Sequence, residues 1–298
     1  MKRGLITWDK SEIPTAAFER RVDGVRRVLR ERDLQALVIY SDMWRSNEAR
    51  FFSNFMPYFN RGLLILPCDF PPTLLCGLSP RVYGWIRSFT TVEDIRPAGN
   101  FAKPLFDIAA ERNWTRVGVL DVERLPHDIY TAIRTGQLGL VDVEPETVLS
   151  PAEDETEIAV RQKAGGIAAQ ILEEEIVNGV GLTDYVFVGN LERRLRRSGA
   201  EDLIVLVTNG QTVPRPPTGT TLEENFSVSV AIEYRGHWVR LSRYHGDAKP
   251  KAPATACSSE RLDGSYPYES GPGTIQADHT EFNHYGKRLF HGDTILRH

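Results

Sequence analysis

Segments with the periodicity of a helix alternate with short apolar runs along the first 120 residues, and this alternation constrains the fold more than any other feature. After Pro14, apolar side chains recur at steps of three and four residues, which predicts a helix. Residues 36–40 then read Ala-Leu-Val-Ile-Tyr, a run typical of a buried strand. The same exchange repeats down the chain, with helices expected over residues 46–52 and 101–113 and after Ser79, and strands over residues 62–66, 73–76, 93–96 and 117–120. Such alternation favours a layered α/β domain with a mostly parallel or mixed sheet.

Acidic residues and prolines gather between Val141 and Glu155, where the apolar periodicity is lost. A stretch of this kind is typical of a domain boundary. The 298 residues, 41% of them apolar, are enough to supply a core to each of two domains. We therefore expect an α/β domain over residues 1–145 and a second domain over residues 146–298. The second domain is predicted to begin with two helices, over residues 158–176 and 185–197, and a strand over residues 203–208.

Residues 226–245 consist of two alternating apolar runs on either side of Tyr234-Arg235-Gly236, which predicts a β-hairpin. The second run carries Arg240, Arg243 and His245 but no carboxylate. Cations therefore occupy positions where a divalent metal would require anionic ligands. We expect this hairpin to bind an anion or a polar neutral molecule.

Six of the seven histidines lie at or after residue 237. They are His237, His245, His279, His284, His291 and His298. The residues have no helical metal-binding spacing, and nearby glycines and prolines predict loops. Strand-like runs are expected near the end of the chain, at residues 288–290 and 294–296. Proton transfer and metal binding both remain open for this group, since histidine serves in either role.

Phe59 and Arg61 belong to a loop rich in aromatic residues, just before the strand expected at residue 62. An arginine at the entrance of a strand can hold a carboxylate through two hydrogen bonds while a neighbouring ring excludes water. A surface arginine beside the edge of a core would give the same pattern, and the sequence favours neither interpretation.

The overall composition argues against several classes of partner. A net charge of −4 and a pI near 6.0 disfavour nucleic-acid binding, which usually requires a concentrated basic surface. No run approaches the roughly 20 apolar residues that cross a bilayer, so no membrane role is expected. Three cysteines without metal-ligand spacing, in a chain with no apolar leader over residues 1–10, favour a reducing cytoplasm.

The order of these segments resembles the creatinase and aminopeptidase P family. The resemblance is carried by residues 20–30 with 36–40, the Phe-Phe-Ser-Asn-Phe loop at 51–55, residues 150–164, and residues 233–243. The last segment is similar to the family's strand pair that ends in Asp-x-Thr-Arg. The resemblance implies an α/β domain like the N-terminal domain of creatinase, followed by an α+β pita-bread domain that is shortened after Tyr244.

The same resemblance implies a changed site. Two metal-binding aspartates of the family match Ser229 and Arg240, and a ligand glutamate matches Gly292, which leaves Glu269 as the candidate for a retained carboxylate. Creatinase is the family's metal-free hydrolase, and its N-terminal domain sends a Phe and an Arg into the neighbouring subunit's site. Phe59 and Arg61 match that pair by position, which implies a homodimer.

Our leading hypothesis from the sequence is a metal-independent enzyme without a cofactor, acting on a small carboxylate- or amide-containing molecule in a homodimer. The reaction would be C–N bond hydrolysis or a related lyase or isomerase step. In this hypothesis Phe59, Arg61, Arg240 and Arg243 bind the substrate, and His237, His245 and Glu269 are the catalytic candidates. Two alternatives stay open: a catalytically inactive module that binds a peptide or protein, and a divergent metallohydrolase rebuilt from His279, His284, His291 and Glu269.

Overall fold

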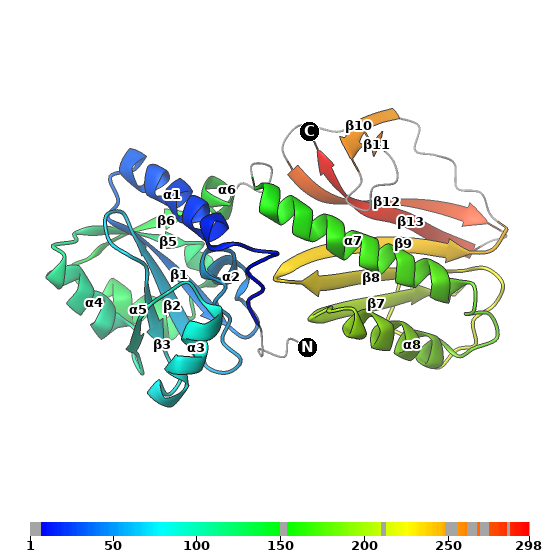
Figure 1. Cartoon of the computed structure of the whole chain (residues 1–298), viewed down its shortest axis with the longest axis horizontal. Helices are drawn as coiled ribbons and strands as arrows, with labels where there is room; N and C mark the ends of the chain where they lie inside the picture. Colours follow the sequence, from blue (N-terminus) through cyan, green and yellow to red (C-terminus); the bar gives the residue numbers. More distant parts are fainter. Residues whose placement is uncertain are drawn as a thin grey trace. The chain divides into compact units, whose positions relative to one another are not determined.

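A computed structural model of the chain describes residues 7–149, 154–209 and 213–247, together with the backbone of four further strands between residues 256 and 297. The chain divides into two compact units, residues 2–150 and residues 151–298, which we call the N-terminal and C-terminal units (Figure 1). Among the described helices, none is long and apolar enough to cross a membrane.

The N-terminal unit is built on a mixed six-stranded sheet in the order β4-β3-β2-β1-β5-β6. Its strands are β1 (Ala36–Asp42), β2 (Arg61–Pro67), β3 (Thr73–Cys76), β4 (Asp94–Pro97), β5 (Arg116–Leu120) and β6 (Gly139–Val143). β2 runs antiparallel to both β1 and β3, whereas β3–β4, β1–β5 and β5–β6 are parallel pairs. The mixed α/β sheet expected from the sequence is thus confirmed.

Helices cover both faces of this sheet. They are α1 (Thr15–Glu31), α2 (Asn47–Ser53), α3 (Tyr83–Phe89), α4 (Ala102–Glu111), α5 (His127–Arg134) and α6 (Pro145–Val148), with short 3₁₀ turns η1 (Pro80–Val82) and η2 (Val122–Arg124). Alternate residues of β1 enter two different cores, since Leu37 and Ile39 pack on one side and Val38 and Tyr40 on the other. A strand buried on both faces has to be apolar throughout, which explains the continuous run at residues 36–40.

The end of the N-terminal unit contains elements that the sequence pattern did not predict. α5, β6 and α6 all fall after residue 125, and the last two overlap the stretch where periodicity is lost. β6 is a half-exposed edge strand and α6 is a single turn, so neither carries a long apolar pattern. The N-terminal unit therefore includes α6 and ends at residue 150.

The C-terminal unit pairs two helices with a five-stranded antiparallel sheet in the order β12-β13-β9-β8-β7. The elements are α7 (Glu155–Ile176), α8 (Asp184–Arg197), β7 (Asp202–Thr208), β8 (Phe226–Tyr234), β9 (His237–His245), β12 (Thr274–His284) and β13 (Lys287–Arg297). A separate pair is formed by β10 (Ala256–Glu260) and β11 (Pro267–Tyr268). Figure 1 shows α7 lying along β8 and β9, on which it packs.

Local signals fix the ends of these elements. The side chain of Asp154 accepts a hydrogen bond from the Glu157 amide at the start of α7, and Thr183 caps α8 in the same way. Arg235 and Gly236 both have positive φ, 51° and 85°. This is the signature of the tight turn whose twist matches two hairpin strands, and the predicted hairpin is confirmed.

The loops predicted around the C-terminal histidines are a wrong prediction, whereas the strand-like runs expected at residues 288–290 and 294–296 both belong to β13. His279 and His284 belong to β12 and His291 belongs to β13, and these two strands pair without interruption over eleven residue pairs. Gly292 takes its place in this ladder opposite His279. The backbone hydrogen bonds of a long ladder outweigh the weak strand preference of a single glycine, so composition misled here.

Candidate functional site

The central feature of the C-terminal unit is a contact between Arg240 and Ser229. Arg240 on β9 donates from Nε to the Oγ of Ser229 on β8 over 3.0 Å. Arg240 pairs in register with Ala231, so Ser229 is its diagonal neighbour, and an arginine side chain spans that separation. The pair joins neighbouring strands, and the hydrogen bond to Ser229 orients the guanidinium of Arg240.

Alternation along β8 and β9 separates two faces of the sheet. Val228, Val230 and Ile232 are fully buried on the face that packs against α7. Ser229, Ala231 and the buried Glu233 lie on the other face, together with their register partners Ser242, Arg240 and Trp238. We call this second surface the Arg240 face.

Ser242 supplies a second hydroxyl group to the Arg240 face. It lies directly opposite Ser229 in the register of the two strands and is fully buried. Its Oγ has no hydrogen-bond partner among the described residues. Leaving a buried hydroxyl without a partner costs about 1–3 kcal/mol, so this group is suited to a ligand or water that completes its hydrogen bonding.

The row of residues through Ser229 continues across the whole sheet. Leu206 of β7 pairs with Ser229, Ser229 with Ser242, Ser242 with Gly292 of β13, and Gly292 with His279 of β12. The first three positions carry one aliphatic side chain and two hydroxyls. His279 enters the row by its backbone position, two strands from Ser242.

His237 lies on the α7 face, at the start of β9. Its Nδ1 is 3.4 Å from Oε1 of Glu157, and both side chains are buried. Arg161 donates to the same carboxylate over 2.8 Å and also to the backbone carbonyl of Trp238. Burial by itself would raise the pKa of Glu157, but the hydrogen bond from His237 and the charge of Arg161 outweigh it and lower the pKa to about 2. The three residues tie the hairpin turn to the first turns of α7.

Arg243 also belongs to the α7 face. Its Nε donates to Oε1 of Glu173 on α7 over 3.3 Å, and the residue is buried. Arg243 lies an odd number of residues from Arg240, so the two side chains lie on opposite sides of the sheet. The structure therefore does not bring together the two arginines that the sequence suggested as joint substrate ligands.

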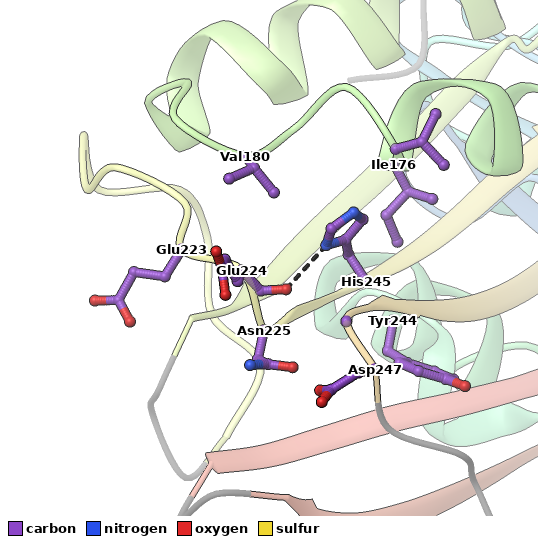
Figure 2. A pocket seen from close by; sticks show the side chains of 10 residues that line it. Ile176, Val180, Glu223, Glu224, Asn225, Tyr244, His245 and Asp247 are labelled. Carbon is purple, nitrogen blue, oxygen red and sulfur yellow. Dashed lines mark hydrogen bonds between the residues drawn. The ribbon is translucent and has the colours of Figure 1, made fainter.

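His245 ends β9 and lines an open pocket beside the C-terminal end of α7 (Figure 2). Its ring stacks on Phe226 with 5.4 Å between ring centroids, and its Nδ1 lies 2.9 Å from the carbonyl oxygen of Glu224. Eight residues of strand separate it from His237, roughly 27 Å at about 3.4 Å per residue. The two histidines thus belong to different places, and both lie on the face opposite Arg240.

The other predicted site residues lie in the N-terminal unit or outside the described residues. Arg61 begins β2 and pairs with Asp128 of α5, with 2.8 Å between Nη1 and Oδ2. The hydrogen bond from Arg61 lowers the pKa of Asp128. Phe59 is 65% exposed. Glu269 lies outside the described residues, and the same holds for the side chains of His279, His284 and His291.

Solved structures share this architecture over nearly their whole length. No family model and no curated protein matches the chain. An Xaa-Pro dipeptidase from Bacillus anthracis matches with a TM-score of 0.70 and 13% identity, over 94% of this chain and 95% of its own. An X-Pro aminopeptidase from Thermotoga maritima MSB8 matches with a TM-score of 0.69 and 15% identity, over 93% and 97%. A prolidase from Pyrococcus horikoshii OT3 matches with a TM-score of 0.71 and 12% identity, over 93% and 95%.

The chain has the fold of the prolidases and aminopeptidases P. This confirms the resemblance read from residues 20–55, 150–164 and 233–243, and with it the pita-bread architecture. At identities of 12–15% the likeness extends to the fold, and the chemistry has to be argued from the residues of this chain.

The residues of the Arg240 face do not fit a divalent metal on this prolidase fold. Divalent cations are bound by carboxylate, imidazole or thiolate groups, and a guanidinium at a ligand position repels them. Ser229 and Ser242 offer neutral hydroxyls, Arg240 adds a positive charge, and Glu233 is the one carboxylate that β8 and β9 place on this face. In the part of the chain whose side chains are described, no three His, Cys, Asp or Glu residues gather as a metal site would need.

Two parts of this site escaped the sequence interpretation. Ser242 belongs to no sequence motif that would mark it as a site residue. Its spacing of two residues from Arg240 does place both on the same face of a strand. The Glu157–Arg161 pair follows the helical spacing of four residues, and its burial under the hairpin became evident only in the fold.

Proposed function

We propose that the C-terminal unit binds a small carboxylate-bearing molecule on the Arg240 face, without a divalent metal. The observation that carries the proposal is the Arg240–Ser229 hydrogen bond at 3.0 Å, beside the buried hydroxyl of Ser242. A guanidinium matches a carboxylate through parallel N–H donors, and such charge-assisted bonds are the strong ones. Because Ser229 accepts a hydrogen bond from Nε, the Arg240 side chain is already partly ordered, and it loses less conformational entropy when a ligand binds.

A second candidate function is catalysis at the same site. In this case the bound molecule would be hydrolysed at a C–N bond. Proton transfer requires an acid–base group close to the ligand. His237 and His245 lie on the opposite face, so neither suits this role. The observation in favour of catalysis is the position of His279 in the row through Ser229 and Ser242. We propose His279 as the acid–base group, with Glu269 as the further catalytic candidate.

The proposal includes a homodimer in which Phe59 and Arg61 of one subunit reach the ligand of the other, as the family resemblance implies. In support, the Arg61–Asp128 pair is largely solvent-exposed, and exposed ion pairs contribute only about 0–1 kcal/mol. A ligand carboxylate can therefore replace Asp128 at little cost. Light scattering of the purified chain tests the oligomeric state directly.

Titration calorimetry with N-acetylglycine, which carries both a carboxylate and an amide, tests the binding proposal. We expect Arg240→Gln to weaken binding at least tenfold, because it removes the charge of the guanidinium. Arg197→Gln is the matched control, since it removes the same charge from an exposed position at the end of α8. Binding should persist in EDTA and should not strengthen with Mn²⁺, Zn²⁺ or Co²⁺. Equal affinity of the wild type and Arg240→Gln, or binding that requires one of these metals, contradicts the proposal.

Hydrolysis is tested separately, by following release of glycine from N-acetylglycine. The expected outcome for His279→Gln is loss of turnover with unchanged ligand affinity. A wild type that binds but releases no glycine leaves the chain as a binding protein for this compound.

A further inference from the structure

The open pocket beside the C-terminal end of α7 contains His245 (Figure 2). His245 lies five residues along β9 from Arg240 and on the opposite face of the sheet, so this pocket is separate from the Arg240 face. Its volume of about 1260 Å³ is ample for a small organic molecule. Among the ten described residues that line it, three are carboxylates and none is a lysine or an arginine.

The contacts of His245 decide which of its ring nitrogens can accept a hydrogen bond. Nδ1 lies 2.9 Å from the backbone carbonyl oxygen of Glu224. Because a carbonyl oxygen only accepts, we assign the hydrogen to Nδ1, which leaves Nε2 of the neutral ring with a lone pair. The ring also stacks on Phe226 with 17° between the ring planes, which fixes its orientation. Nε2 has no hydrogen-bond partner among the described residues, so it can accept a hydrogen bond from a ligand.

The rest of the pocket combines a negative charge with apolar side chains. Glu224 is exposed, and its carboxylate forms no hydrogen bond or ion pair with any described residue. Val177 and Val180, at the end of α7 and in the turn after it, are 63% and 42% exposed. Figure 2 shows Ile176 and Val180 on one side of the His245 ring and Asp247 on the other. An anion would be repelled by Glu224, and a purely polar ligand would leave the two valines in water.

We infer that this pocket binds a primary aliphatic amine in its ammonium form. The two polar groups available to a ligand, Nε2 of His245 and the carboxylate of Glu224, both accept hydrogen bonds. A primary ammonium group supplies three N–H donors and the opposite charge. Its aliphatic chain then contacts Val177 and Val180. No residue is shared with the Arg240 face, so this inference does not depend on the proposed function.

An NMR titration of the ¹⁵N-labelled chain with hexylamine, hexan-1-ol and hexanoate tests the choice of head group, because all three carry the same six-carbon chain. Hexylamine should bind about threefold to fivefold more tightly than hexan-1-ol, since an exposed ion pair raises affinity by up to about fivefold. Hexanoate should bind most weakly. Methylamine should bind about tenfold more weakly than hexylamine, because it lacks the apolar contact. Equal affinities for the three head groups would overturn the inference.

Two variants test the residues that recognise the amine. Glu224→Gln should remove the preference for hexylamine over hexan-1-ol. His245→Phe keeps a ring that can stack on Phe226, so the variant should fold, and it should weaken binding of both compounds about threefold. Glu192→Gln is the matched control, since it removes the same charge from a half-exposed position on α8. Wild-type affinities in both Glu224→Gln and His245→Phe would place the amine elsewhere.

Long-range ¹H–¹⁵N correlation spectra of the imidazole rings test the tautomer directly. We expect the signal that is lost in His245→Phe to show hydrogen on Nδ1, and hexylamine should shift the signal of its Nε2. A purely structural role for His245 would leave that signal unmoved. Hydrogen on Nε2, or no shift on binding, contradicts the inference.

Two further measurements examine other occupants of the pocket. Lys249 and Lys251 follow the last residue that lines it and lie outside the described residues. Replacing both by Gln should change the affinity for hexylamine less than about twofold, and a gain of tenfold or more would mean that a lysine of the chain itself occupies the site. Saturating N-acetylglycine should leave hexylamine binding unchanged. Displacement of hexylamine would show that the two compounds share one site and would overturn the inference.

Discussion

Arg240 and Arg243 lie three residues apart on β9 and serve different faces of the same sheet. Arg240 donates to Ser229 on the face away from α7, and Arg243 donates to Glu173 on α7 itself. Nothing in the sequence distinguishes the two arginines. Because they lie an odd number of residues apart on one strand, their side chains lie on opposite faces of the sheet. Arg243 joins the helix to the sheet, whereas we propose that Arg240 recognises a ligand.

This difference predicts opposite effects on stability and binding. Arg243→Gln removes a buried side chain and its contact with Glu173, and we expect a loss of about 1–2 kcal/mol in the free energy of unfolding. Arg240→Gln changes an exposed position and should alter stability by less than about 0.5 kcal/mol while it weakens carboxylate binding. Urea unfolding and calorimetry of both variants measure the two effects. The assignment of faces fails if Arg243→Gln binds carboxylates more weakly at unchanged stability.

The buried pair of Glu157 and His237 predicts a pH dependence of stability. The pKa of Glu157 is lowered from its ordinary 4.5 to about 2, so the folded state binds the proton more weakly than the unfolded chain. The resulting stabilisation is fully present above about pH 4.5 and is lost as the pH falls toward 2. It is on the order of 3 kcal/mol, since one pKa unit corresponds to about 1.4 kcal/mol.

Glu157→Gln should therefore lower the stability of the protein at pH 7 and flatten its pH dependence between pH 5 and 3. Urea unfolding at pH 7, 5 and 3 measures this for the variant and the wild type. Glu192→Gln on α8 is a suitable control, because it changes a half-exposed glutamate elsewhere in the same unit. Parallel pH profiles for the wild type and Glu157→Gln would show that Glu157 does not carry the effect.

Much of the fold could be predicted from the sequence because its signals are local. The hairpin of β8 and β9 combines two alternating runs with a turn at Arg235 and Gly236, all within twenty residues. α7 and α8 are likewise marked by their own periodicity and by the caps Asp154 and Thr183. α5 was missed because only Ile129 and Ile133 are buried in it, which is too few to make a pattern.

The candidate site could be predicted only in part, because it depends on contacts between distant segments. The sequence placed a cation, Arg240, where the family resemblance implies a metal ligand. The expectation that the hairpin binds an anion was inferred from this charge. The position of His279 depends on a ladder that joins β12 to β9 through β13, some 40 residues along the chain. The placement of His237, Arg243 and His245 on the α7 face likewise follows from packing against a helix more than 60 residues earlier.

Two glycines of the C-terminal unit should respond in opposite ways to a methyl group. A Cβ at Gly179 would lie 2.6 Å from a ring carbon of Phe226 and 3.1 Å from Phe187, so Gly179→Ala should destabilise the protein by about 1–3 kcal/mol. Gly166 lies on the exposed side of α7 with nothing within 4 Å, and Gly166→Ala should stabilise it by about 0.5–1 kcal/mol. Thermal unfolding of the two variants gives the comparison. Stability changes of the same sign would contradict the packing of Phe226 beneath this turn.

The buried hydroxyl of Ser242 predicts a conflict between stability and binding. Its Oγ has no partner among the described residues, so Ser242→Ala removes an unsatisfied polar group and should raise the free energy of unfolding by about 1 kcal/mol. If the hydroxyl instead completes its hydrogen bonding with a bound carboxylate, the same variant should bind N-acetylglycine about fivefold to tenfold more weakly. Calorimetry and urea unfolding of Ser242→Ala, with Ser198→Ala at the end of α8 as the control, measure both quantities. A variant that is less stable than the wild type would mean that the hydroxyl serves the folded structure, and unchanged affinity would remove Ser242 from the binding site.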